Sequence, residues 1–279
     1  MTIPVLPDGA REIAIRAALD AGAILRGRLS QTREVAYKGV IDLVTDADRA
    51  SEELISSRIR GAFPDHGFLG EEGTRGAEGA EFNWVVDPLD GTTNYAHAYP
   101  HFAVSIALEQ HGRAVLGVVY DPTRDELFVA GRGGGATLNG APIHVTAEDQ
   151  LLRSLLATGF PYDPGKRAEA LAVWDALMDA CQGVRRDGAA ALNLSWVACG
   201  RLDGFYERNL KPWDMAAGAL IVEEAGGVIS DYAGGTFDLY GIEIVAAGAA
   251  LHEPLRSVVQ RTVEHIAAVP VASAGHGAG

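Results

Sequence analysis

The sequence has 279 residues, of which 48% are hydrophobic and 22% charged, a composition typical of a globular protein with a substantial core. Its 37 acidic and 23 basic side chains give a formal net charge of −14, which excludes a long nucleic-acid ligand or an anionic membrane surface as the expected partner. A small phosphate ester stays compatible with this charge if divalent cations reverse the repulsion locally.

The beginning of the chain, MTIPVLPDGA, has neither the basic nor the apolar region of a signal peptide. No apolar run approaches the roughly 18 residues of a membrane helix. Cys181 and Cys199 show no CxxC spacing, which favours buried, reduced thiols. We therefore expect a cytoplasmic protein without membrane contact.

Two helices are predicted in the first third of the chain. The first covers residues 11–30 with Asp8 as its cap, and the second covers residues 47–63 with Thr45 or Asp46 as its cap. Short strands are expected around these helices, at residues 35–38, 42–45 and 67–70.

The middle of the chain is rich in strands, which are predicted at residues 84–87, 102–110, 113–121 and 125–131. Short turns join them and imply antiparallel pairing. A glycine run at 133–135 could suggest a phosphate loop, but no GxxxxGK[ST] pattern follows, so we interpret it as a hairpin turn.

Beyond about residue 150, strands and helices alternate, which predicts a second α/β layer. We therefore divide the chain into an N-terminal α+β subdomain of residues 1–150, built on an antiparallel sheet, and a C-terminal α/β subdomain of residues 151–268. Residues 269–279 are rich in small side chains, and we expect a disordered tail there.

The segment WVVDPLDGTTN places two carboxylates at a junction between a strand and a helical turn. Pro88 is expected to end the strand after Asp87, and Asp90 begins a turn. The two carboxylates and the Leu89 carbonyl are oxygen ligands of the kind that Mg²⁺ prefers. Backbone N–H groups from Gly91 onward can hold phosphate oxygens, so metal and phosphate sites would adjoin.

Each acidic motif by itself has an ordinary explanation. Asp-Pro and Asp-Gly pairs are common in surface turns, and Glu71 and Glu72 could simply be solvated. Asp214 could be a helix cap. The functional interpretation therefore depends on their combination.

The ordered set GEE, WVVDPLDGTTN and PWDMAAGALIVEEAGG resembles the inositol monophosphatase family, whose members are Mg²⁺-dependent, Li⁺-sensitive phosphatases. The resemblance covers residues 38–231 and includes DLVTDAD and GAAALNLSWVACGRLDGFYE. It implies an α/β (α+β) fold, a layered α-β-α-β-α sandwich of the inositol monophosphatase and fructose-1,6-bisphosphatase type. It also implies a homodimer, and an active site between the two subdomains with most metal ligands in the first.

By matched position, the resemblance implies that two to three Mg²⁺ ions bind in each active site. Glu71, Asp87 and the Leu89 carbonyl would hold one ion, and Asp87, Asp90 and Asp214 a second. A weaker third ion would lie near Glu71.

The same resemblance implies roles in catalysis and substrate binding. A metal-activated water at Glu71 would attack phosphorus directly, oriented by Thr92 with Asp48 behind it. Residues implied or proposed to contact the substrate are Asp90, Gly91, Thr92, Arg185, Ala190, Glu207 and Asp214. Lys211 is a further candidate cation, at a position where animal members usually have histidine.

The expected enzyme is a phosphoric monoester hydrolase that converts myo-inositol 1-phosphate to myo-inositol and orthophosphate. The same chemistry on fructose 1,6-bisphosphate, histidinol phosphate or a nucleotide 3′-phosphate remains open, because pocket loops change specificity without changing metal ligands. A protein-partner role in transcription antitermination is a further alternative. No basic patch supports direct RNA contact.

Overall fold

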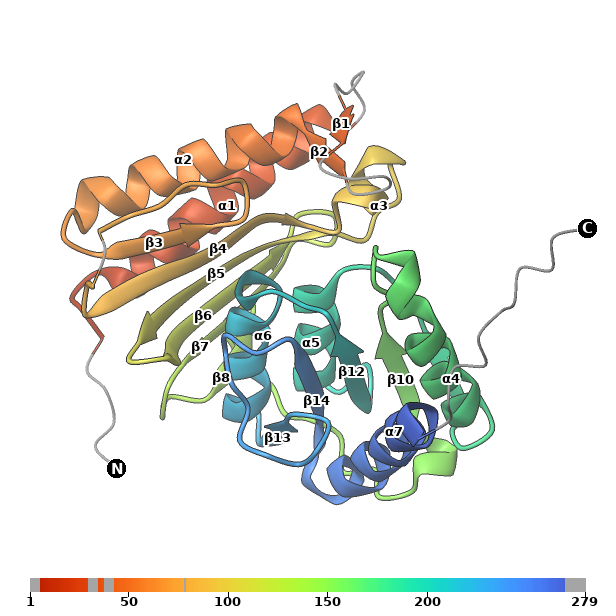
Figure 1. Ribbon diagram of the computed structural model, residues 1–279. Coiled ribbons are helices and arrows are strands. Elements are labelled where there is room, and N and C mark those ends of the chain that lie inside the picture. Colours follow the sequence, from red (N-terminus) through yellow and green to blue (C-terminus); the bar gives the residue numbers. More distant parts are fainter. Residues whose placement is uncertain (1–5, 30–34, 38–42, 78, 269–279) are drawn as a thin grey trace, which may run out of the picture.

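The computed structural model of the protein describes residues 6–29, 35–37, 43–77 and 79–268. Its elements stack in five layers, in the order helices, sheet, helices, sheet, helices (Figure 1). The three helical layers are formed in turn by α1 (Ala10–Arg28) with α2 (Asp46–Ala62), α5 (Ala190–Ala198) with α6 (Pro212–Glu224), and α4 (Arg167–Met178) with α7 (Ala249–Ala268). The predicted α-β-α-β-α sandwich is confirmed.

The first sheet has seven strands in the order in which they follow one another in the chain: β3 (Gly67–Gly70), β4 (Phe82–Asp90), β5 (Ala103–Gln110), β6 (Arg113–Asp121), β7 (Glu126–Gly131), β8 (Ala136–Leu138) and β9 (Ala141–Pro142). Neighbouring strands of this sheet are antiparallel except β3 and β4, which pair in parallel. The sheet is therefore not wholly antiparallel, in contrast to the antiparallel sheet predicted from the sequence. The β7–β8 hairpin confirms the turn predicted at residues 133–135.

The second sheet has five strands in the order β11-β10-β12-β14-β13. Their bounds are β10 (Leu155–Thr158), β11 (Gly183–Arg185), β12 (Gly204–Arg208), β13 (Gly227–Ser230) and β14 (Glu243–Gly248). The pairs β10–β11 and β10–β12 are parallel, whereas β12–β14 and β13–β14 are antiparallel, so this sheet is mixed. The switch between sheets falls between Pro142 and Leu155, and the subdomain boundary at residue 150 stays a prediction.

Five short elements complete the fold of the described residues. The predicted strand pair is present as β1 (Val35–Tyr37) and β2 (Leu43–Thr45), and α3 (Thr92–Ala96) follows β4. Two single-turn 3₁₀ helices lie at Leu151–Arg153 and Pro164–Lys166. The expected tail at 269–279 lies outside the described residues.

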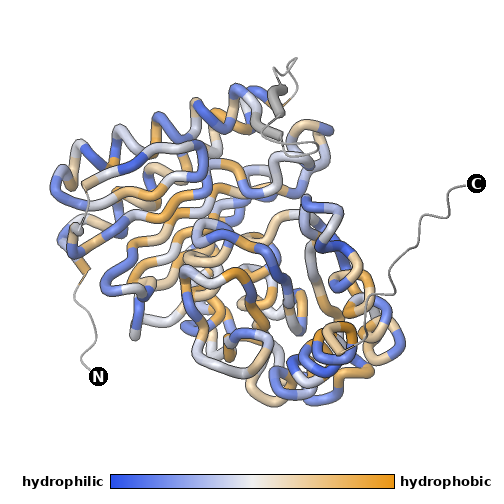
Figure 2. Tube along the Cα trace, in the orientation of Figure 1, coloured by the Kyte–Doolittle hydropathy of each residue, from blue (hydrophilic) through white to orange (hydrophobic). Residues whose placement is uncertain are grey.

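The middle layer is apolar on all sides because it lies between two sheets. Every residue of α6 from Met215 to Val222 is buried. Gly117 of β6 has no side chain where the backbone of α6 approaches, and an added Cβ there would lie 2.7 Å from the carbonyl oxygen of Ala217. In Figure 2 hydrophobic residues run along the strands, whereas hydrophobic and hydrophilic residues alternate on the outer helices.

The helix caps follow local side-chain chemistry. Thr45 caps α2 in a capping box with Asp48, as one of the two predicted caps. The prediction for α1 is wrong, because its cap is Gly9 in a left-handed conformation and no side chain bonds there. None of the helices in the described part of the chain is long and apolar enough to span a membrane.

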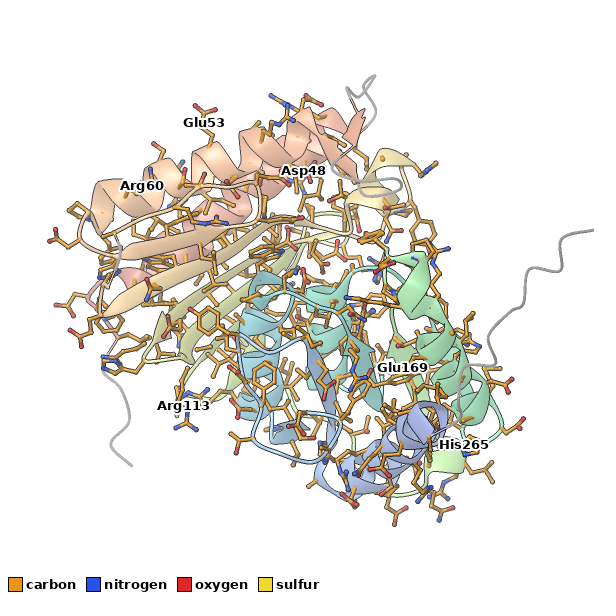
Figure 3. The ribbon with its side chains drawn as sticks, viewed as in Figure 1. Asp48, Glu53, Arg60, Arg113, Glu169 and His265 are labelled. Carbon is orange, nitrogen blue, oxygen red and sulfur yellow. The ribbon has the colours of Figure 1, made fainter. Side chains whose placement is uncertain are left out.

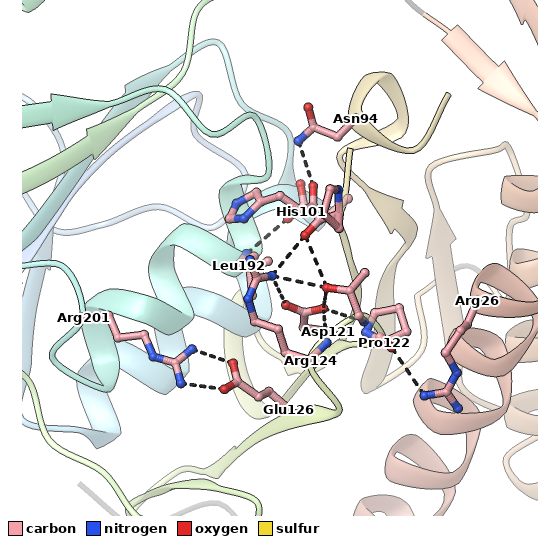
Figure 4. A network of polar contacts seen from close by, with 12 residues as sticks. Arg26, Asn94, His101, Asp121, Pro122, Arg124, Glu126, Leu192 and Arg201 are labelled. Atoms are coloured by element: carbon pink, nitrogen blue, oxygen red, sulfur yellow. Dashed lines mark hydrogen bonds and ion pairs between the residues drawn. The ribbon is translucent and has the colours of Figure 1, made fainter. Parts of the chain in front are cut away.

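Ion pairs tie α5 to the first sheet. Arg201, just beyond α5, contacts Glu126 of β7 through two N–H···O bonds of 2.5 and 2.6 Å (Figure 4). In the same network Arg124 pairs with Asp121 at 2.7 Å. The Arg201–Glu126 pair thus joins the end of α5 to β7 of the first sheet, and the Arg124–Asp121 pair lies within the connection between β6 and β7.

Candidate active site

A cavity of about 100 Å³ lies at the end of β4, beside the starts of α3, α5 and α6. All but three of the residues predicted from the sequence for the site line it: Glu71, Asp87, Leu89, Asp90, Gly91, Thr92, Ala190, Glu207 and Asp214. The three exceptions are Asp48, Arg185 and Lys211. The fold therefore brings together four segments that lie far apart in the chain.

The end of β4 differs from the prediction. Pro88 does not end the strand, which continues to Asp90, and the pairing with β5 shifts between Asp87 and Asp90. Residues three apart on a regular strand point to opposite faces. The bulge re-aims the side chains, so that both carboxylates line the same cavity, and it accommodates the missing N–H of proline.

Asp90 is buried, with 6% of its surface exposed, and does not lie on a solvent-facing turn. Its two carboxylate oxygens accept hydrogen bonds from the N–H groups of Ala190 and Leu192, at 3.0 and 3.2 Å. These donors belong to the first turn of α5, where backbone N–H groups have no partner within the helix and favour negative charge. Asp90 thus joins the first sheet to the second half of the chain.

The carboxylates of the cavity repel one another. Burial raises the pKa of Asp87 and of Asp214 well above the ordinary value, and the neighbouring Glu71 carboxylate raises both further. Burial also raises the pKa of Asp90 to about 7 and that of Glu207 to about 8. The cavity is therefore a place where a cation would be strongly favoured.

The chemistry of these donors fits Mg²⁺. The residues that line the cavity carry carboxylate and carbonyl oxygens, and such oxygens are the usual ligands of this hard cation. Within the described residues, no three Asp, Glu, His or Cys side chains are drawn together tightly enough to form a ready-made metal centre.

Asp48 lies behind the cavity and acts on it through Thr92. The hydroxyl of Thr92 is 3.0 Å from Oδ1 of Asp48 and 3.1 Å from the Leu89 carbonyl oxygen. The other oxygen of Asp48 accepts from the N–H and the hydroxyl of Thr45, so the carboxylate is held firmly. Burial outweighs these hydrogen bonds and raises the pKa of Asp48 to about 6.

Gly91 allows close packing where α3 meets the segment before α5. It has a φ of 92°, and an added Cβ would lie 3.0 Å from the carbonyl oxygen of His101 and 3.3 Å from Cβ of Ala189. Asn94 closes the same junction by donating to the carbonyls of His101 and Asp187, at 2.8 and 2.7 Å. The only sequence signal for Asn94 was its place in the acidic motif.

The arginine of the cavity is Arg186, and not Arg185 as predicted. Both arginines are exposed, but Arg185 ends β11 and is not part of the cavity lining, whereas Arg186 lines the cavity together with Phe160 and Tyr162. Neighbouring residues of an extended segment point in opposite directions, so only one of two adjacent arginines can face the site. Lys211 lines an adjoining cavity of about 250 Å³.

The five-layered fold and the acidic cavity at its centre are those of a hydrolase of phosphoric monoesters. The chain belongs to the inositol monophosphatase family, whose model it matches over residues 7–264. The family and enzyme class expected from the sequence are thus confirmed.

The chain is similar to named members of this family. It is 43% identical to an inositol-1-monophosphatase of Rhizobium meliloti over 256 residues, which is 90% of this chain and 96% of the relative. It is also 43% identical over 256 residues to the Nus factor SuhB of Pseudomonas aeruginosa, covering 89% of this chain and 94% of the relative. A solved inositol monophosphatase structure from Anabaena superposes with a TM-score of 0.82 at 43% identity, covering 90% and 95% of the two chains.

Proposed function

We propose that the protein hydrolyses a small phosphate monoester in a Mg²⁺-dependent reaction, with myo-inositol 1-phosphate as the preferred substrate and myo-inositol and orthophosphate as products. The observation that carries the proposal is the convergence of Glu71, Asp87, Asp90 and Asp214 on one cavity. These acids come from three separate regions of the chain. If each belonged only to a surface turn, there would be no reason for all four to line one cavity.

The proposed ligands of two to three Mg²⁺ ions are Glu71, Asp87, the Leu89 carbonyl, Asp90 and Asp214. When bound, such ions supply the positive charge that lowers the pKa of a water and stabilises the attacking and leaving oxygens of an in-line displacement. The protein's part is to hold these donors in a buried cavity, where little water competes with them.

Thr92 is proposed to orient the attacking water. A hydroxyl carries one hydrogen, and donation of that hydrogen to Asp48 leaves the oxygen of Thr92 free to accept from the water. It also leaves the Leu89 carbonyl free for its role as a ligand. The fixed position of Asp48 therefore sets the direction in which the oxygen of Thr92 accepts a hydrogen bond from the water.

The substrate would lie between the start of α3 and β12. Backbone N–H groups of Gly91 and Thr92 are proposed to hold the phosphate oxygens. Glu207 and the Ala190 backbone, both in the cavity lining, would contact hydroxyls of the alcohol part. Asp90 would reach a hydroxyl as well as an ion, and Arg186 adds a positive charge on the same side.

A turnover panel tests the proposal. Purified protein with Mg²⁺ is expected to release phosphate from myo-inositol 1-phosphate with a higher kcat/KM than from fructose 1,6-bisphosphate, histidinol phosphate or a nucleotide 3′-phosphate. A clear preference for one of the latter three would keep the chemistry and replace the substrate. Absence of release from every small phosphate ester would refute the proposal.

Arg186→Ala is expected to raise KM and lower kcat/KM for the phosphate ester by about tenfold, since a hydrogen bond to a charged group contributes about 1.5–3 kcal/mol and exposure reduces it. Arg185→Ala is the matched control, because it removes the same charge one residue away from the cavity lining. Steady-state kinetics of the two variants side by side is the measurement. A loss with Arg185→Ala alone would return the role to Arg185.

A second candidate function is a protein-partner role in transcription, favoured by the relative named Nus factor SuhB. The net charge of −14 points to contact through a protein and not directly to RNA. Affinity capture from a bacterial lysate is expected to recover a transcription component if this role exists. Capture that recovers none under conditions where the protein is folded counts against it.

The homodimer and the inhibition by Li⁺ remain proposals that rest on the resemblance. The cytoplasmic location remains a proposal that rests on the cysteine pattern. Analytical ultracentrifugation checks the homodimer. Phosphate release measured against increasing Li⁺ at constant ionic strength checks the inhibition.

A further inference from the structure

The inner face of α2 carries three buried polar side chains behind the cavity: Asp48, Ser51 and Glu52. Each contacts a different segment of the site. Asp48 holds Thr92, as described above, and the hydroxyl of Ser51 donates to the carbonyl of Pro88 at 2.8 Å. Glu52 reaches the third segment, the loop that follows Glu71.

Glu52 binds this loop through hydrogen bonds from two backbone N–H groups. One carboxylate oxygen accepts from the N–H of Glu72 at 2.8 Å, and the other accepts from the N–H of Thr74 at 3.0 Å. Only 3% of the surface of Glu52 is exposed. In the described part of the chain no basic side chain pairs with it, so the two N–H groups are the main compensation for its burial.

The local geometry is built around this contact. An added Cβ on Gly70 would lie 2.4 Å from the nearer oxygen of Glu52, so the glycine leaves room for the carboxylate. On its other side the loop is joined to β4, because the N–H of Glu71 donates to the carbonyl of Val86 at 3.2 Å. The backbone at Glu71 is thus held from β4 in front and from α2 behind.

We infer that Glu52 is a positioning residue of the metal site, which holds the loop so that the Glu71 carboxylate faces Asp87 in the cavity. The inference rests on the proposed function, in which Glu71 and Asp87 are metal ligands. A buried carboxylate without a cationic partner is costly, and an apolar side chain would fill the same space without that cost. What only the carboxylate provides is two acceptors in one plane, which match two N–H groups two residues apart.

The test compares Glu52→Gln with Glu53→Gln. Glutamine keeps the shape of Glu52 but places an NH₂ group against one of the two N–H donors. Glu53 is the matched control, since it is the next residue of α2 and projects outward, whereas Asp48 lies on the inner side (Figure 3). The measurements are Mg²⁺ binding by isothermal titration calorimetry, thermal unfolding of the metal-free protein, and the Mg²⁺ concentration for half-maximal phosphate release.

Loss of a residue that orients a metal ligand lowers metal affinity by about 10–100-fold, and we expect a change of this size for Glu52→Gln. The metal-free protein should remain folded, and KM for the phosphate ester at saturating Mg²⁺ should change by less than about twofold. Glu53→Gln should match the wild type in every measurement. A folded Glu52→Gln protein that binds Mg²⁺ as tightly as the wild type overturns the inference.

Glu52→Asp separates position from charge and provides a second variant. It keeps the negative charge but is one methylene too short to reach both N–H groups, so it should lose Mg²⁺ affinity much as Glu52→Gln does. Wild-type affinity in Glu52→Asp would show that charge alone matters and would overturn the positioning role. If the wild type itself binds no Mg²⁺ in the calorimeter, it is the proposed function that fails first.

Discussion

Asp90→Asn is expected to lower kcat for phosphate release by at least about 100-fold, since loss of an outer residue that merely orients a ligand already costs about 10–100-fold. Asparagine has the shape of aspartate but only one acceptor oxygen. The cavity would lose a negative charge that balances bound cations, and one of the N–H groups of Ala190 and Leu192 would lose its acceptor. A buried N–H left without an acceptor costs about 1–3 kcal/mol, which the relief of carboxylate repulsion partly offsets.

Asp203→Asn is the matched control for this prediction. Asp203 also accepts a backbone hydrogen bond, from Leu155 at 2.7 Å, but it is not part of the cavity lining. This variant should keep turnover within about twofold of the wild type and lose little stability, because the one amide oxygen of asparagine can still accept from Leu155. Phosphate release, circular dichroism and thermal unfolding of both variants are the measurements. More than a tenth of wild-type activity in a folded Asp90→Asn protein would contradict the assignment.

Magnesium is expected to raise the thermal unfolding midpoint of the wild type by several degrees, and chelation should reverse the shift. A ligand that binds only the folded state stabilises it by about 2.7 kcal/mol at a concentration 100 times its dissociation constant. The buried carboxylates of Asp87, Asp90 and Asp214 repel one another in the folded state. Neutralising this repulsion is possible only while the cavity is formed.

Asp87→Asn separates specific binding from general screening. Asp87 is the acid assigned to both principal ions, so this variant should show little stabilisation by Mg²⁺, although its metal-free form should be at least as stable as the wild type because one buried charge is gone. NaCl at the same ionic strength serves as the control for screening. An equal shift with NaCl, or an undiminished Mg²⁺ shift in Asp87→Asn, would argue against a metal site in this cavity.

Local sequence patterns predicted the elements well. The helix at α2, the strands β5 to β7 and the hairpin at 133–135 depend on periodicity, caps and turn residues that lie within one segment. The acidic motifs could also be found in the sequence, because their order along the chain matches the order seen in the family. Their combination also carried the resemblance that led to the family.

The predictions that the structure contradicts concern places where residues far apart in the chain are in contact. Pro88 was expected to end a strand, but pairing with β5 carries β4 through a bulge to Asp90. The sequence predicts that Asp90 begins a turn, but the first turn of α5, a hundred residues further on, covers it and supplies its hydrogen bonds. No local pattern contains information on such a partner.

For this protein, then, neighbouring residues of the sequence were enough to predict the order of helices and strands and the oxygen chemistry of Asp87 and Asp90 that suits Mg²⁺, whereas the complete acidic set was named through the resemblance to the family. Only the packed fold could show that Arg186 faces the cavity in place of Arg185, and that Glu52 clamps the loop of Glu71. The physical reason is that orientation and burial depend on which layers meet. A side chain acquires its partners only when the sheets and helices on both sides of it are in place.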